Sequence, residues 1–336
     1  MEMIRFAPPL TFSRRSLVRM DSPFGFRFAR QAGRFGLVAA LCGGWALTAR
    51  AGGPAQGRLF GRLLAVDAQL SDAPQEATAR AEFDRLAHAA SPCAAAAGLG
   101  EDRARCVVDA LFRSGQLSTV EDPGDPQSST VTSVLASHKG NCAALTAVAL
   151  ALAERVGVPM EAVVFPRHVV VRSPADPDHA LELLQRGSEL TMAQTRKRLG
   201  ADGARDTRVR ANAFPAYYMD NLAVRFAEAG NADRAETMFK RAIEDSPRMP
   251  RVRFNYGTFL LGKGRHTLAE KQLRRAVRLD SRNPPAWANL GVAVARLGDT
   301  AEARRCFQRA LRYDPRNRVA TDNLKALGRD GPPPPR

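Results

Sequence analysis

The middle of the chain begins with segments in which apolar residues recur at helical spacing. This spacing predicts helices over residues 75–88 and 102–112. A nearly all-apolar run then extends from Cys142 to about Arg155, directly after a Gly-Asn pair that interrupts the pattern. The pattern therefore predicts a buried helix with Cys142 in its first turn.

Shorter apolar runs follow this helix and are separated by polar breaks, as strands are. They predict strands over residues 161–165, 168–172 and 180–184, followed by a connecting helix over 191–199. Helices that precede a group of adjacent strands indicate an α+β domain. We place this domain at residues 52–215.

Residues 216–330 carry a different pattern, which recurs every 34 residues. Three kinds of residue recur at this period. The small residues that allow two helices to pack closely are Ala223, Gly257 and Gly291, and the glycines suited to ending a helix are Gly230, Gly264 and Gly298. The asparagines within the first helices are Asn221, Asn255, Asn289 and Asn323. Because asparagine is a weak helix former, its recurrence predicts a hydrogen bond between neighbouring units.

This pattern resembles the tetratricopeptide repeat (TPR) family. The resemblance implies an all-α solenoid of three helical hairpins (216–249, 250–283 and 284–317) and a capping helix (318–330). TPR proteins bind peptides or protein segments on a concave face lined by first helices; packing against the neighbouring domain is the alternative use. The inward-facing residues expected to contact a partner are Tyr217, Asp220, Arg251, Phe254, Thr258, Val292 and Arg296.

Three residues with catalytic potential follow one another on the predicted elements. Cys142 begins a helix, where the helix dipole favours a thiolate, and His168 and Glu182 lie on two of the strands. A thiol, an imidazole and a carboxylate in this order are typical of nucleophilic catalysis. The structural alternatives are a core histidine and a salt bridge from Glu182 to Arg172 or Arg186.

No CxxC or HxxxH spacing is present, so we expect no metal and no cofactor. A metal site formed by Cys142, His168 and His179 is the third option.

The segments around the three residues resemble the transglutaminase-like superfamily of papain-type folds. The similarity rests on Lys139-Gly-Asn-Cys142, on Phe165-Pro-Arg-His168-Val-Val-Val-Arg172 and on the run that contains Glu182. It is closest to a bacterial branch that carries C-terminal TPR repeats. The resemblance implies that Cys142 is the nucleophile, that His168 is the base and that Glu182 orients the imidazole.

The sequence departs from that family in one respect. Relatives with catalytic activity carry an aromatic residue close after the histidine, where this chain has Val169-Val170, and some members lack the cysteine. Two functions are therefore expected. The first is an exported cysteine acyl-transferase or amide hydrolase whose protein substrates are recruited by the repeats. The second is a non-catalytic TPR scaffold with a degenerate transglutaminase-like domain.

Residues 1–51 have the features of a targeting segment. Arginines precede an apolar run at 35–49, and Ala49-Arg50-Ala51 is a small-x-small cleavage site. We expect a signal peptide and a periplasmic or secreted protein after cleavage near Ala51; an uncleaved anchor in the inner membrane is the alternative. Cys93 and Cys106 can pair in an oxidising compartment or stay unpaired.

Charge is distributed unevenly along the chain. The net charge is +16, and residues 216–336 contribute 24 basic and 13 acidic residues, whereas residues 52–215 are nearly neutral, with 18 basic and 19 acidic residues. A basic repeat array favours an acidic protein or peptide partner. No nucleic-acid-binding motif accompanies the charge, so no nucleic acid is expected.

Overall fold

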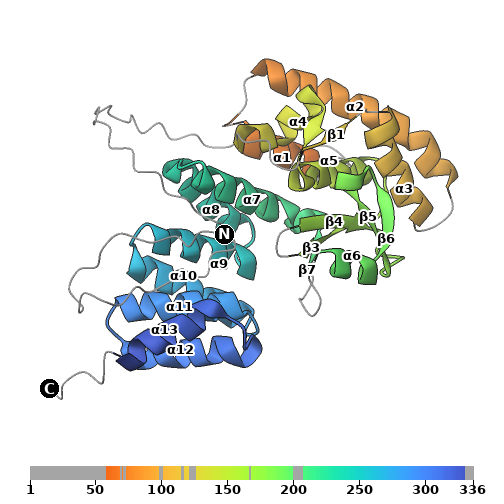
Figure 1. Cartoon of the computed structure of the whole chain (residues 1–336). Helices are drawn as coiled ribbons and strands as arrows, with labels where there is room; N and C mark the ends of the chain where they lie inside the picture. Colours follow the sequence, from red (N-terminus) through yellow and green to blue (C-terminus); the bar gives the residue numbers. More distant parts are fainter. Residues whose placement is uncertain are drawn as a thin grey trace, which may run out of the picture.

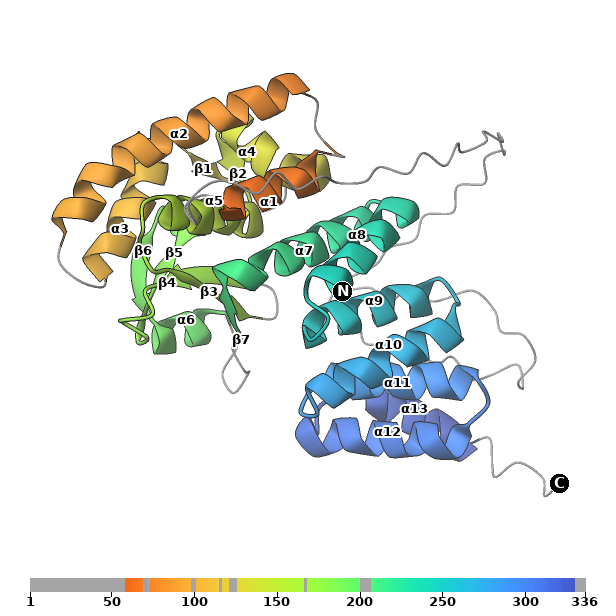
Figure 2. The same ribbon diagram turned by 180° about the vertical axis from the view of Figure 1, so that it is seen from behind.

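The computed structural model describes residues 58–68, 70, 73–97, 101–114, 117–120, 126–165, 168–199 and 207–329. The described residues form a mixed α/β part followed by a stack of helical hairpins, as Figures 1 and 2 show from opposite sides. The predicted leader, its cleavage site and Cys42 lie outside the described residues. No described helix is both long enough and apolar enough to span a bilayer.

The mixed part begins with helices that build most of its hydrophobic core. The last of them, α5, is buried along almost its whole length, as its apolar sequence predicts. The helices are α1 (Arg58–Asp67), α2 (Ala73–Ala96), α3 (Glu101–Asp109), α4 (Val131–Ser137) and α5 (Cys142–Arg155).

An antiparallel sheet follows, with the strand order β6-β5-β4-β3-β7. Strands β3 and β4 have the predicted bounds. Strand β5 ends at Glu182 rather than at residue 184, because a 3₁₀ turn (Leu183–Gln185) follows it. The strands are β3 (Glu161–Phe165), β4 (His168–Arg172), β5 (His179–Glu182), β6 (Ser188–Thr191) and β7 (Thr207–Arg210); β1 (Ser118–Thr119) and β2 (Lys139–Gly140) form a separate parallel pair.

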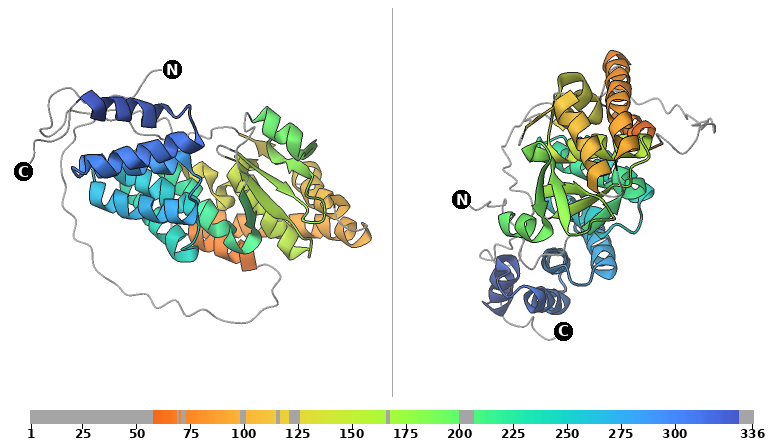
Figure 3. Two further views of the ribbon diagram at one scale, coloured as in Figure 1. Left: turned by 90° about the horizontal axis from the view of Figure 1, so that it is seen from below. Right: turned by 90° about the vertical axis from the view of Figure 1, so that its right-hand side faces the viewer.

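Side chains on the central strands alternate between two apolar layers. Ala162 and Val164 of β3 face the main core, which includes α5, whereas Val163 and Phe165 join a smaller cluster with Met192 of α6 (Met192–Arg198). Helices α5 and α6 thus cover opposite faces of the sheet (Figure 3). Both faces of β3 and β4 are apolar because both are buried.

The second part consists of antiparallel hairpins, each made of consecutive helices, with one helix after them (Figures 1 and 3). The described helices are α7 (Phe214–Glu228), α8 (Ala232–Asp245), α9 (Pro250–Gly262), α10 (His266–Leu279), α11 (Pro284–Arg296), α12 (Thr300–Tyr313) and α13 (Arg318–Arg329). The repeated glycines explain this geometry. Gly230, Gly264 and Gly298 have positive φ (81°, 72° and 96°) in the turn within each hairpin.

Close packing and repeated hydrogen bonds join these helices. A Cβ added to Gly291 would lie 2.6 Å from the ring of Phe307, so only glycine allows α11 and α12 to approach this closely. Asn255 donates to Asp220 of the preceding hairpin, and Asn289 donates to Thr258 of its preceding hairpin. The predicted hydrogen bond between neighbouring units is therefore confirmed at these two asparagines. The capping-helix Asn323 instead donates to Val319 in its own helix.

A buried polar contact attaches the first hairpin to the mixed part. Tyr218 of α7 donates its hydroxyl to Asp67 at 2.7 Å and accepts the backbone N–H of Val131 at 2.7 Å. Asp67 also accepts two hydrogen bonds from Thr132. Burial raises the pKa of Asp67 to about 6, although these hydrogen bonds oppose the shift. Helix α7 is therefore packed into the core of the mixed part as well as into the stack of hairpins.

Several elements were not predicted from the sequence. Strand β6 precedes the predicted connecting helix and β7 follows it, in segments where no strand was predicted. Strand β7 pairs with β3 through mostly exposed polar residues rather than an apolar run. The helix predicted at 102–112 instead loosens into a π-helical turn (Ala110–Ser114).

Candidate functional site

Cys142 is the first residue of α5, and the residues before it hold the helix start in place. The Asn141 side chain caps the helix by accepting the Ala144 N–H at 2.9 Å, and its amide donates to Ser129 at 3.0 Å. Gly140 packs so closely on Val134 that an added Cβ would lie 2.8 Å from that side chain. The thiol itself is half-buried and is not in a disulfide.

His168 and Glu182 lie on adjacent strands and contact each other. His168 begins β4, Glu182 ends β5, and the imidazole Nε2 lies 2.5 Å from a Glu182 carboxylate oxygen. The other carboxylate oxygen accepts the Leu184 N–H at 2.9 Å, so both oxygens of Glu182 are held. Since Nε2 is engaged by Glu182, Nδ1 is the ring nitrogen left for the thiol.

Cys142 lies within interaction range of His168, so the structure brings the three predicted catalytic residues together. Burial alone would lower the pKa of His168. The hydrogen bond that the imidazole makes to the negatively charged Glu182, together with its interaction with Cys142, outweighs burial and raises the pKa to about 9. The imidazole is therefore protonated at neutral pH, next to the sulfur atom.

The structural alternatives for Glu182 have other partners in this molecule. Arg172 is paired with Glu161 in a buried contact of 2.8 Å, and Arg186 donates to the Phe112 carbonyl at 3.0 Å. Arg186 itself adopts a left-handed conformation (φ 54°) in the turn after β5. Neither arginine competes with His168 for the Glu182 carboxylate.

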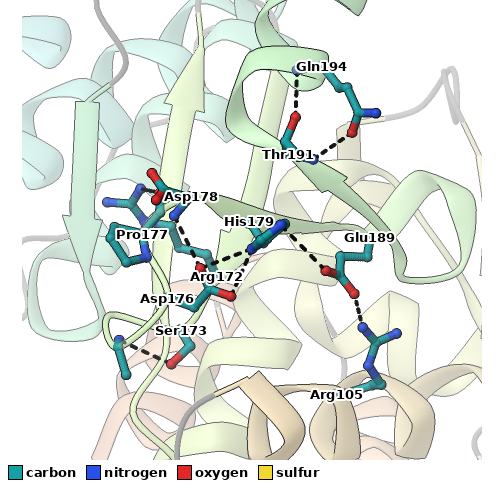
Figure 4. Close-up of polar contacts among 11 residues, drawn as sticks. Arg105, Arg172, Ser173, Asp176, Pro177, Asp178, His179, Glu189, Thr191 and Gln194 are labelled. Carbon is teal, nitrogen blue, oxygen red and sulfur yellow. Dashed lines mark hydrogen bonds and ion pairs between the residues drawn. The ribbon is translucent and has the colours of Figure 1, made fainter.

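Figure 4 shows a second polar cluster, centred on His179 of β5 and Glu189 of β6. His179 contacts Asp176 at 2.9 Å and lies 4.0 Å from Glu189, which is itself paired with Arg105. His179 is thus part of a salt-bridge cluster separate from Cys142 and His168. Within the described ranges, no group of three or more His, Cys, Asp and Glu side chains is arranged to hold a metal ion.

The remaining cysteines have structural surroundings. Cys93 of α2 and Cys106 of α3 form a disulfide with their Cα atoms 5.7 Å apart. The sequence left open whether these two cysteines pair, and the structure shows that they do. Cys306 is buried in α12, and burial raises the pKa of its thiol to about 11. Among the cysteines that the structure describes, Cys142 alone combines partial exposure with a partner histidine.

The residues predicted to contact a partner fall into two groups. Most of them are buried and hold the helices together, as Thr258 does when it accepts from Asn289; the buried ones are Tyr217, Asp220, Phe254, Thr258 and Val292. Arg251 and Arg296 keep part of their side chains exposed. Contact with a partner through this face stays a prediction, and these two arginines are its best candidates.

One arrangement around the thiol was not predicted from the sequence. Arg251 of α9 donates through Nε to Asp220 at 2.9 Å, and its guanidinium lies 5.2 Å from the ring centre of Tyr217. Both Tyr217 and Arg251 lie within electrostatic range of Cys142. These residues lie more than 70 positions after Cys142 in the chain, so local pattern offers no signal for this proximity.

The comparisons with known proteins agree with this architecture. Residues 77–225 match the transglutaminase-like superfamily, and residues 221–284 and 284–317 match tetratricopeptide repeats. The first match extends into α7, the helix that is packed into both parts. No curated protein matches the chain.

Solved structures similar to this chain are TPR domains. The second TPR domain of human RPAP3, in complex with an HSP70 peptide, is 25% identical, with 34% of this chain and 95% of that chain covered and a TM-score of 0.33. The Arabidopsis OM64 TPR domain is 22% identical (35% and 98% covered, TM-score 0.34). The Sgt2 TPR domain from Aspergillus fumigatus is 17% identical (36% and 85% covered, TM-score 0.33). On the family matches, the chain contains a domain of the transglutaminase-like superfamily followed by tetratricopeptide repeats.

Proposed function

We propose that the protein is a cysteine-dependent acyl-transferase or amide hydrolase that acts on peptides or proteins. The observation that carries the proposal is the contact of His168 with both Cys142 and Glu182. A protonated imidazole beside the sulfur stabilises a thiolate, which is the reactive form of cysteine. Glu182, held by the Leu184 N–H, keeps the imidazole oriented.

The reaction follows from these roles. The Cys142 thiolate attacks an amide carbonyl carbon; a C–S bond forms and negative charge moves to the carbonyl oxygen. The backbone N–H of Cys142, at the start of α5, is suited to donate to that oxygen. His168 gives its proton to the amide nitrogen as the C–N bond breaks, and an amine leaves the thioester. Water or a second amine then attacks the thioester, loses a proton to His168 and releases the thiolate.

Three further proposals concern the partner of the repeats, the compartment of the protein and its association with the membrane. The basic repeats bind the substrate protein or another peptide partner, and their charge favours an acidic one. The protein acts in the periplasm or after secretion, which the Cys93–Cys106 disulfide supports because such bonds persist in oxidising compartments. An uncleaved leader would associate it with the membrane instead.

The test is the rate at which iodoacetamide alkylates Cys142, measured from pH 5 to pH 9 and resolved by site with mass spectrometry. We expect Cys142 to react at pH 6 at least about 100-fold faster than glutathione, because an ordinary thiol with a pKa of about 8.5 is nearly all protonated there. His168→Ala should remove this advantage, and His179→Ala, in the separate cluster, should retain it. If Cys142 reacts no faster than glutathione, or is indifferent to His168→Ala, the protein is a scaffold and the catalytic proposal is wrong.

A further inference from the structure

The nucleophile lies close to the repeat array as well as to its own domain. Helix α7 packs against α5, which begins at Cys142, and also against α9, which carries Arg251. The Tyr218–Asp67 hydrogen bond fixes α7 against the mixed part. The position of Arg251 relative to the thiol is therefore set by packed helices rather than by a flexible linker.

Several contacts hold the guanidinium of Arg251 in one orientation. Asp220, which is fully buried, accepts from Arg251 Nε, and the Asn255 amide donates to both Asp220 oxygens at 3.0 and 2.8 Å. The Tyr217 ring lies beneath the guanidinium. A planar group fixed at Nε and by an aromatic ring presents its remaining donors in a defined direction.

Those remaining donors have no acceptor among the described residues. The hydrogen bond that Arg251 makes to Asp220 uses Nε and leaves the two Nη atoms for a ligand. The side chain is 26% exposed. Burial acts to lower the pKa of Arg251, but the adjacent Asp220 carboxylate helps to raise it above its usual value. The guanidinium is thus a permanent cation with free donors near the thiol.

We propose that Arg251 is a specificity-determining residue of the active site: its Nη donors bind a carboxylate of the acyl donor and place the adjacent amide carbonyl at Cys142. The inference rests on the proposed function. An arginine fork matches the two oxygens of a carboxylate, so the substrate class is a peptide with a carboxylate next to the cleaved amide. The carboxylate belongs either to an acidic side chain or to the peptide C-terminus. The repeat array therefore supplies part of the active site.

The experiment compares an anionic and a neutral alkylating agent on the full chain. Iodoacetate and iodoacetamide react in the same way: the thiolate sulfur bonds to the CH₂ carbon and iodide leaves. The ratio of their rates at Cys142 therefore reports how strongly the site attracts a carboxylate, independently of the reactivity of the thiol itself. His168 also attracts anions, so the informative comparison is between variants.

Arg251→Gln should lower the iodoacetate-to-iodoacetamide ratio about tenfold, as expected from removing one charge at close range. Arg253→Gln is the matched control, since Arg253 is on the same helix but bonds to Gln272. It should leave the ratio unchanged. Arg251→Lys should keep most of the ratio, and circular dichroism melting verifies that each variant is folded. In the wild type, raising the salt concentration should lower the ratio with no variant involved.

Blocking peptides distinguish the two sources of the carboxylate. Glu-containing amidated, Gln-containing free-acid and Gln-containing amidated peptides are compared for protection of Cys142 from iodoacetamide. Protection by the amidated Glu peptide supports a side-chain carboxylate, and protection by the free-acid Gln peptide supports a C-terminal carboxylate. Equal protection by these two peptides and the amidated Gln peptide overturns the inference.

Two further results would overturn the inference and locate its failure. If Arg251→Gln lowers both alkylation rates equally, the arginine only stabilises the thiolate, and the catalytic proposal survives without the specificity role. If Cys142 does not react with iodoacetamide in the wild type, the proposed function fails and the specificity role fails with it.

Discussion

The two parts of this molecule are stabilised in different ways. In the repeats, the same kinds of contact recur at intervals of one repeat: Gly257 lies against Leu273, and Gly291 lies against Phe307. In the transglutaminase-like domain, contacts occur once and join distant residues, as the hydrogen bond from the Leu59 N–H to Glu154 does across 95 positions. A repeat can therefore be recognised from short-range pattern, whereas the candidate site depends on the whole domain being folded.

The charges differ in the same way. Arginine and glutamate pairs of the repeats lie near the surface, where ion pairs contribute little stability, as with Arg265 and Glu236. The Arg172–Glu161 pair of the sheet is buried, so loss of either partner would leave an uncompensated charge. Changes in the mixed part should therefore affect its chemistry, whereas changes in the repeats, apart from Arg251, should affect individual packing contacts.

The largest expected effect is at His168. Glu182→Gln removes the adjacent negative charge, so the pKa of His168 should fall from about 9 toward its ordinary value of 6.5. A complete loss of that shift corresponds to about 3 kcal/mol. An NMR titration of the imidazole measures it, and Glu189→Gln is a control on the same sheet.

The same shift links stability to pH. Because the folded pKa of His168 is above the unfolded value of 6.5, its contribution to stability is fully present below pH 6.5 and is lost as pH rises through about 9. Glu182→Gln should lower the pH at which this contribution to stability is lost. A His168 that still titrates near pH 9 in Glu182→Gln would contradict the geometry.

The disulfide should produce the next largest effect, confined to the mixed part. Replacing both Cys93 and Cys106 by alanine should lower the free energy of unfolding by about 3 kcal/mol, because the bond closes a loop of 13 residues in the unfolded chain. Urea denaturation measures this loss. Dithiothreitol should destabilise the wild type and leave the double variant unchanged, and hydrogen exchange should change in α2 and α3 but not in α9 to α12.

The smallest effect is expected at a packing contact of the repeats. Gly257→Ala should cost about 1–3 kcal/mol, because the new Cβ would lie 2.6 Å from Leu273 Cγ. Gly262→Ala, on the same helix with no atom within 4 Å of the added Cβ, should be neutral or slightly stabilising. Thermal melting of the two variants tests the difference. Equal melting temperatures would show that the packing of α9 on α10 is less tight than described.

The sequence alone was sufficient for the local features. The 34-residue period placed the small residues and the turn glycines, because each acts within its own hairpin. The all-apolar run after Asn141 placed Cys142 at a helix start, and the order of Cys142, His168 and Glu182 on their elements matched a known family. Strands β6 and β7 were not predicted, since their polar residues form strands only through pairing with neighbours.

Only the tertiary structure decided which residues surround the thiol. Three features depend on contacts between distant elements: whether Cys93 and Cys106 pair, the pairing of Arg172 with Glu161 rather than Glu182, and the approach of Arg251 to Cys142. Hydrophobic periodicity states which face of a helix is buried, but it does not state what that face meets. Cys142 could therefore be proposed as a nucleophile from the sequence, whereas the approach of Arg251 to it could not.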